Sequence, residues 1–211
     1  MDEIIPIFPL EIVVYPGDAL NLHIFEPRYQ QLVEDCESSK MPFGIPSVVD
    51  RAIAGLGTLV KLTNVSNLQP DGQRDIKTRG LKIFRIVKLI KLYPGKLYSA
   101  AVVQYEENDV VGDADLRRQV VASVKKLHRL LNVEKDFAKT ETELTSYDLA
   151  HHVGLSVAQE YALLKLFSED ERLAYLKKHL ELALPVVTGM ESLKEKIQLN
   201  GHFKHLPGFE L

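Results

Sequence analysis

The sequence predicts an α+β protein, in which a mostly antiparallel β subdomain with one helix precedes a helical subdomain. Two observations lead to this prediction. The first half consists of short apolar runs separated by turns that contain proline and glycine, a pattern typical of strands. From Asp113 onward, apolar residues instead recur at helical spacing. The predicted division is a β-rich subdomain at 1–107, a helical subdomain at 113–200 and a C-terminal tail at 201–211.

The opening segment predicts edge strands or sharp bends. Its apolar runs at 4–10 and 12–15 are interrupted by prolines, which cannot donate to a central ladder. Residues 19–25 then alternate apolar and polar side chains, as in a half-buried strand. Pro27 suits the first position of a helix, which we expect to run from Pro27 to Glu37. The positions i, i+3, i+4 and i+7 of this helix form one buried stripe of Tyr29, Leu32, Val33 and Cys36.

A long β stretch follows this helix. The predicted strands are 56–65, 74–92 and 97–105, joined by a Pro-Asp-Gly turn at 70–72 and a Pro-Gly turn at 94–95. Turns of this kind set the local geometry, so the three segments should pair as an antiparallel meander.

About four helices are expected after Asp113, packed as a small bundle. Ser156 with Gln159, and Ser168 with Glu171, have the spacing of a capping box and indicate helix starts. Pro185 predicts a kink or break before a final helical segment that ends near residue 200.

Composition is that of an ordinary globular protein of 211 residues, with 45% apolar residues and a net charge of −3. The apolar runs are far shorter than a membrane span, and the N-terminus lacks the basic start of a signal peptide. The single cysteine excludes an internal disulfide framework. We therefore expect a cytoplasmic protein that is not inserted in a membrane.

No motif for catalysis, cofactor binding or metal binding is present in the sequence. It lacks a phosphate-binding loop, a G-x-S-x-G elbow, an H-E-x-x-H pair and any cysteine pair. The seven histidines show no spacing that gathers three or four zinc ligands. Cys36 lies on an apolar stripe between acidic neighbours, which favours a core thiol over a reactive one. We expect no catalytic residue and no cofactor.

The middle of the chain supports an alternative, RNA binding. Residues 57–105 hold nine basic and two acidic side chains, although the chain as a whole is acidic. Basic residues recur every three positions from 82 to 91, which cannot form one clean stripe on a strand without a bulge. The candidate RNA contacts are Arg74, Lys77, Arg79 and Lys82.

Four short segments carry a resemblance to a known family. The segments IPIFPL at 5–10, YPG at 15–17 and IFEPRY at 24–29 resemble the opening signature of the N-terminal domain of Lon proteases, and GLKIFRI at 80–86 is similar to a later block. The resemblance implies a β subdomain of the PUA-like type, a partly closed barrel, followed by helices. It also implies recognition of protein substrates, while the ATPase and Ser-Lys protease parts of Lon lie in domains that this sequence does not contain.

The resemblance leads to a functional hypothesis. We expect a non-catalytic, ATP-independent module that binds unfolded or exposed apolar polypeptide segments as an adaptor or accessory factor, with RNA binding through 57–105 as the alternative. The prolines of the opening segment should keep it at a sheet edge, where neighbouring apolar side chains frame a docking groove. The candidate polypeptide-binding residues are Ile7, Phe8 and Tyr15.

The remaining signature residues are interpreted as structural. We expect Glu26 to lie beside the positive end of the helix that begins at Pro27, and Arg28 to pair with an acidic group of the neighbouring sheet. The residues assigned to this structural set are Pro9, Pro16, Gly17, Phe25, Glu26, Arg28 and Tyr29.

Overall fold

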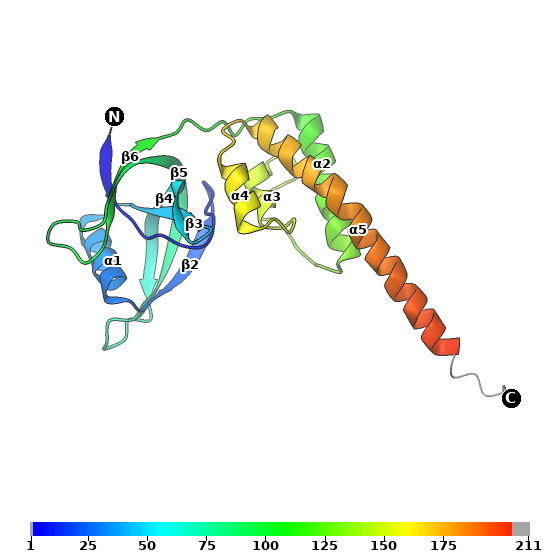
Figure 1. The fold of residues 1–211 in the computed structure, drawn as a ribbon, viewed down its shortest axis with the longest axis horizontal. Helices are drawn as coiled ribbons and strands as arrows, with labels where there is room; N and C mark the ends of the chain where they lie inside the picture. The colour runs from blue at the N-terminus through cyan, green and yellow to red at the C-terminus, as the bar shows by residue number, and fades with distance from the viewer. Residues whose placement is uncertain (1, 204–211) are drawn as a thin grey trace. The chain divides into compact units, whose positions relative to one another are not determined.

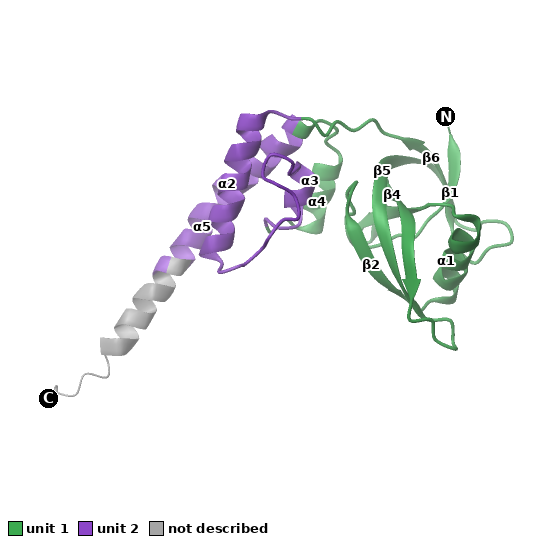
Figure 2. Cartoon of the chain, turned by 180° about the vertical axis from the view of Figure 1, so that it is seen from behind, with its two compact units in different colours: residues 1–111, 154–169 green, residues 112–153, 170–211 purple. Residues whose placement is uncertain are grey.

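The computed structural model describes residues 2–203, which form two compact units. Unit 1 comprises residues 2–111 and 154–169, and unit 2 comprises residues 112–153 and 170–203 (Figure 2). The sequence predicts one helical subdomain at 113–200, whereas in the structure residues 154–169 group with the β-rich part.

Unit 1 is built on an antiparallel sheet of six strands, shown in blue to green in Figure 1. The strand order is β1-β6-β5-β4-β3, and β2 pairs with β5 beside this path. The longest strand, β5, therefore pairs with β4, with β2 through its first half and with β6 through its second half. The strands are β1 (Glu3–Pro6), β2 (Ala19–Ile24), β3 (Phe43–Val49), β4 (Ala52–Ser66), β5 (Arg74–Ile90) and β6 (Ala100–Tyr105). The predicted α+β class with an antiparallel sheet is confirmed.

The sheet is strongly curved but is not closed by strand pairing. β1 and β3 are its two ends, and only isolated parallel bridges, Ile7 to Gly44 and Leu10 to Ser47, join the chain after β1 to β3. The backbone N–H of Phe8 donates to the carbonyl of Gly44 at 2.8 Å. Bulges interrupt the long ladders, and they bend and twist the strands.

The helix α1 (Pro27–Ser39) packs one face against this curved sheet. It begins with Pro27, as predicted, and it ends where Lys40 adopts the left-handed conformation with φ 57°. The predicted stripe is confirmed, since all four of its side chains are buried in one core with residues of β2, β3, β4 and β5.

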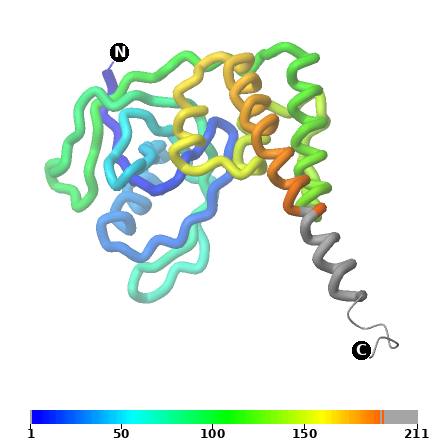
Figure 3. The backbone as a smooth tube through the Cα atoms, turned by 45° about the vertical axis from the view of Figure 1, so that its right-hand side comes forward, coloured from blue at the N-terminus to red at the C-terminus, as the bar shows by residue number. Residues whose placement is uncertain are grey.

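The helix α4 (Val157–Leu164) belongs to unit 1, and Figure 3 shows its yellow segment beside the strands. The hydroxyl of Tyr15 donates to the carbonyl of Glu160 at 3.1 Å. The N–H of Leu56 donates to the hydroxyl of Tyr161 at 3.1 Å. The predicted capping box of Ser156 and Gln159 is present at the start of α4.

Unit 2 contains α2 (Ala114–Leu130), α3 (Ser146–Ala150) and most of α5 (Glu169–Phe203). Asp113 caps α2 by accepting from the N–H of Leu116. The buried guanidinium of Arg172 donates to the Ser146 hydroxyl at 2.9 Å and lies over the Tyr147 ring. The apolar side chains at the centre of this unit include Val120, Val124 and Leu127 of α2 and Leu173, Leu176 and Leu180 of α5.

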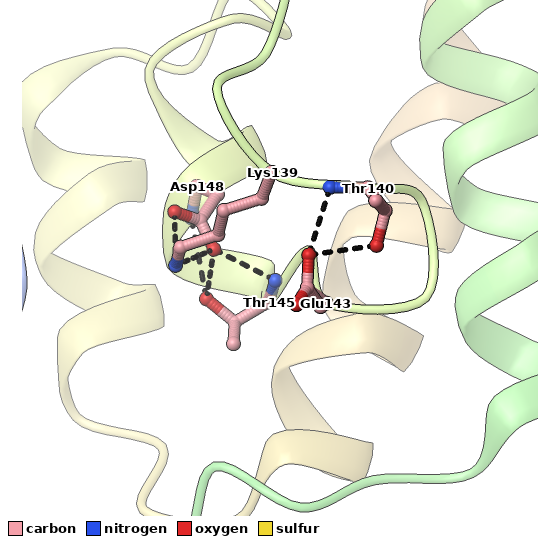
Figure 4. Close-up of polar contacts among 5 residues, drawn as sticks. All are labelled: Lys139, Thr140, Glu143, Thr145 and Asp148. Carbon is pink, nitrogen blue, oxygen red and sulfur yellow. Dashed lines mark hydrogen bonds and ion pairs between the residues drawn. The ribbon is translucent and has the colours of Figure 1, made fainter.

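A second capping box, which the sequence analysis missed, fixes the start of α3 (Figure 4). Asp148 accepts from the N–H of Thr145 at 2.8 Å and from Lys139 at 2.7 and 2.8 Å. These partners hold the pKa of Asp148 below its usual value although burial, the largest influence, acts in the opposite direction. Glu143 caps Thr140 in the same loop.

The structure differs from the prediction at four points. The strand β3 was not predicted, since Pro46 stands in its middle, and no strand forms at 12–15. Of the predicted kink or break at Pro185, the break is wrong, because α5 continues through Pro185 as far as Phe203, and residues 201–203 belong to the helix rather than to a tail. The rest of the predicted tail lies outside the described residues. Within the part of the chain that is described, no helix has both the length and the apolarity to cross a membrane.

Candidate functional site

The three residues predicted to flank a bound polypeptide are all buried. Ile7 packs in a core cluster with Ile5 and Phe84. Phe8 stacks on Tyr29, with ring centroids 3.8 Å apart. Tyr15 is fully buried, and its hydroxyl donates a hydrogen bond to the carbonyl of Glu160 in α4. These side chains face the core, so the expectation that Ile7, Phe8 and Tyr15 frame an open groove is not supported.

The turn at Pro16 and Gly17 has a structural role. Gly17 has φ +92°, a conformation that L side chains rarely adopt, and its N–H donates to the carbonyl of Gly80 at 3.0 Å. Gly80 returns a hydrogen bond to the carbonyl of Asp18 at 2.9 Å. This turn therefore fastens the opening segment to β5.

The residues around the start of α1 differ in one respect from the expectation. Glu26 precedes the helix, as predicted, but its side chain makes no capping hydrogen bond. Arg28 pairs with Glu26 at 2.7 Å, so the predicted pairing of Arg28 with an acidic group of the sheet is wrong. Arg28 also lies over the ring of the buried Tyr29. Phe25 is 61% exposed, unlike the other aromatic residues of the signature.

The four candidate RNA contacts do not form one surface. The side chain of Arg74 is 6% exposed and pairs with Glu34 at 2.6 Å, so it is unavailable to a ligand. Lys82 covers the ring of Tyr105 and is separated from Arg79 by a bulge in the ladder of β4 and β5. Only Lys77 and Arg79 share an exposed face of β5.

A third cation, which the sequence analysis did not single out, lies next to these two. Lys61 of β4 is directly opposite Arg79 in the ladder and is also exposed. Among the described residues, neither Lys61, Lys77 nor Arg79 makes an ion pair. Like charges opposite each other on a sheet repel, so this trio leaves positive charge unbalanced on the outer face of β4 and β5.

Two hollows lie on either side of the connection between α1 and β3. The first, here named the edge groove, has a volume of about 320 Å³ and lies along β1. It is lined by residues 3–6 of β1, by Asp35, Ser38, Ser39, Met41 and Pro42 at the end of α1, and by Tyr93, Lys96 and Tyr98. The second, of about 410 Å³, lies between the end of α1 and residues 61–65 of β4.

Exposed apolar side chains stand at the edge groove. Met41 is 48% exposed and lines both hollows, while Ile4 is 54% exposed on β1. Methionine has a flexible, polarisable side chain that adapts to ligands of varied shape. Neither residue belongs to a motif, so no sequence pattern singles it out.

The floor of the edge groove is held in place by a paired acid. Asp35 accepts from the ammonium of Lys96 and from the hydroxyl of Tyr98, both at 2.7 Å. The hydrogen bond from Lys96 holds the pKa of Asp35 below its usual value against the effect of burial. Gln31 accepts from the N–H of Leu97 at 2.7 Å and so fixes the same loop to α1. The groove therefore has a preformed floor.

The described residues offer no reactive constellation. Burial, with a smaller contribution from Asp35, raises the pKa of the Cys36 thiol to about 12, so it is neutral near pH 7. In residues 2–203, no three His, Cys, Asp or Glu side chains gather where they could hold a metal ion. The geometry of the edge groove instead suits noncovalent binding through apolar contacts and through hydrogen bonds to the backbone.

Comparison with known proteins gives one family. A family model described as the ATP-dependent protease La (LON) substrate-binding domain matches residues 4–181. A crystal structure of a Lon N-terminal domain protein from Xanthomonas campestris is similar, with 26% identity and a TM-score of 0.64, over 82% of this chain and 96% of that one. The N-terminal domain of a Lon protease from the Mycobacterium avium complex shares the fold, with 14% identity and a TM-score of 0.61, over 85% of this chain and 98% of the other.

Proposed function

The chain belongs to the family of the Lon substrate-binding domain, and from this premise we propose that it binds exposed apolar segments of unfolded polypeptides at the edge groove. It acts without catalysis and without ATP, as an adaptor or accessory factor. The proposal places it in the cytoplasm, in line with its single, buried cysteine.

The edge groove is the observation that carries this proposal. It combines exposed apolar side chains, Ile4 and Met41, with a floor fixed by Asp35 and Lys96. A concave, mostly preformed surface with a few polar groups is typical of binding sites. Both side chains are exposed at the surface, where a partner can contact them.

The proposal is tested by the aggregation of an unfolded client. Light scattering of reduced lysozyme should rise more slowly when the protein is added without nucleotide. Met41→Asp should weaken this protection, because a charge in the lining of the groove must be desolvated when an apolar segment binds. Val111→Asp is the matched control, since Val111 is 77% exposed in the same unit and does not line the groove.

Both variants should keep a thermal midpoint close to that of the unchanged protein, because exposed substitutions alter stability by only about 0.5 kcal/mol. Equal protection by Met41→Asp and by the unchanged protein would refute the assignment of the site. A complete lack of protection by the unchanged protein would refute the function.

RNA binding is retained as a second candidate because of the unpaired cations Lys61, Lys77 and Arg79. If all three contact phosphates of a single strand, log K should fall with log salt at a slope of about −2. A filter-binding assay with the three residues changed to Glu measures this. Binding that survives the triple change, or that is absent at low salt, excludes these residues as an RNA site.

A further inference from the structure

The backbone of β1 alternates between two sides. The N–H of Ile7 donates to the carbonyl of Ser99, just before β6, at 2.9 Å. In the register of the two strands, Ile5 lies opposite Ala101 and so continues the same series of hydrogen-bonded pairs. Ile4 lies opposite Val102 in the alternate, non-bonded series, and its N–H and C=O therefore point away from β6.

Among the described residues, no strand occupies the side of β1 that lies away from β6 ahead of the bridge at Ile7. β1 is the end of the sheet order, and the first bridge to β3 occurs only at Ile7. Before that point, the chain at 38–42 leaves α1 instead of running along β1, and the edge groove lies between them. The N–H and C=O of Ile4 are thus the free polar groups of the strand edge that borders the groove.

We propose that an extended polypeptide segment adds as a strand to the free edge of β1 and is held there by backbone hydrogen bonds to Ile4. This inference rests on the proposed function and specifies how the segment is bound. In strand addition, the hydrogen bonds join the backbones of the two strands and do not depend on the side chains. One strand edge can therefore bind segments of many sequences. Pro6 has no N–H, so the added strand receives a hydrogen bond from Ile4 but none from Pro6.

The charge of the edge groove selects among such segments. It is lined by two carboxylates, Glu3 and Asp35, and by one cation, Lys96, which is already paired with Asp35. α1 also ends at the groove, and the C-terminal end of a helix carries partial negative charge. The complementary partner is an extended apolar segment flanked by Lys or Arg, rather than an acidic segment or a nucleic acid.

Two substitutions of Ile4 distinguish the contribution of its backbone to binding from that of its side chain. Ile4→Pro removes the N–H that faces the groove and leaves the hydrogen bonds of Ile5 to β6 in place. Ile4→Ala keeps the N–H and removes most of the exposed side chain. The probe is a fluorescent heptapeptide, Lys-Ile-Thr-Val-Thr-Ile-Lys, with acetylated and amidated ends, and its binding is measured by anisotropy.

Ile4→Pro should bind the probe about tenfold more weakly, since it loses a backbone hydrogen bond and places a ring against the added strand. Ile4→Ala should bind within about threefold of the unchanged protein, because it loses only part of the apolar contact. The probe should slow hydrogen exchange at the Ile4 amide and leave that of Ile5 unchanged. The same peptide with every amide N-methylated should not bind, and a version with Glu in place of Lys should bind more weakly.

The outcomes distinguish this inference from the function on which it rests. Unchanged affinity in Ile4→Pro, or undiminished binding of the N-methylated peptide, overturns strand addition but leaves polypeptide binding intact. An equal loss in Ile4→Ala and Ile4→Pro assigns the contact to the side chain and also overturns strand addition. Tighter binding of the Glu peptide overturns the charge preference. If Ile4→Pro fails to fold, strand addition is tested in the unchanged protein by binding of the N-methylated peptide and by hydrogen exchange at the Ile4 amide. Failure of the unchanged protein both to bind the probe and to protect a client overturns the proposed function itself.

Discussion

Gly80 gives a sharp test of how the opening turn is held on β5. A Cβ atom at this position would lie 2.2 Å from the carbonyl oxygen of Tyr15, a backbone atom that cannot rotate away. Gly80→Ala must therefore push the turn off the strand and stretch both hydrogen bonds that join Gly80 to Gly17 and Asp18. Each hydrogen bond contributes about 1 kcal/mol, and backbone strain adds a similar amount, so the expected loss in the free energy of unfolding is about 3 kcal/mol.

The matched control is Gly55→Ala in β4. A Cβ atom there meets nothing within 4 Å, so the change should leave stability unaltered to within about 0.5 kcal/mol. Urea unfolding followed by circular dichroism measures both variants against the unchanged protein. If Gly80→Ala is as stable as Gly55→Ala, the close approach of the turn to β5 is not what requires glycine at position 80.

Three further predictions concern titration and chain cleavage. The thiol of Cys36, with its pKa raised to about 12, should resist iodoacetamide at pH 8 until urea unfolds the protein, and the rate of alkylation measures this. The pKa of Asp35 is lowered in the folded state. The contribution of Asp35 to the free energy of unfolding should therefore be complete above about pH 4 and disappear as the pH falls through the pKa of the folded state. Asp35→Asn should lower the urea midpoint at pH 7 more than at pH 3. Trypsin should cut the loop at 131–145, where most side chains are exposed, earlier than it cuts any strand of unit 1. Mass spectrometry of the early fragments measures this, and early fragments with an intact loop would contradict the prediction.

Local patterns predicted the elements whose signals lie within one segment. The helix that begins at Pro27 is an example, because both its first residue and its apolar stripe are set by the sequence of that helix alone. The capping box at Ser156 was found for the same reason. β3 was missed because Pro46 argues against a strand, and the structure accommodates this proline at the end of the sheet next to a bulge.

The candidate site was beyond the reach of the sequence for a different reason. Composition indicates which residues are apolar, but it does not say which of them the fold covers. Phe8 and Phe25 both belong to the opening signature, yet Phe8 is buried against Tyr29 while Phe25 is exposed. The edge groove is lined by three segments far apart in the chain, so it exists only after β1 has paired with β6.

The two compact units alternate along the chain, since residues 154–169 return to unit 1 after α2 and α3 have formed part of unit 2. During synthesis, about a hundred residues must therefore be added after β1 before its partner β6 is made, and more still before Glu160, the partner of Tyr15, is made. Pairings of such long range form slowly. The nascent chain thus passes through a period in which its first apolar segment has no folded neighbours, and a ribosome stalled before residue 100, where β6 begins, should display an N-terminal segment that proteases and chaperones can reach.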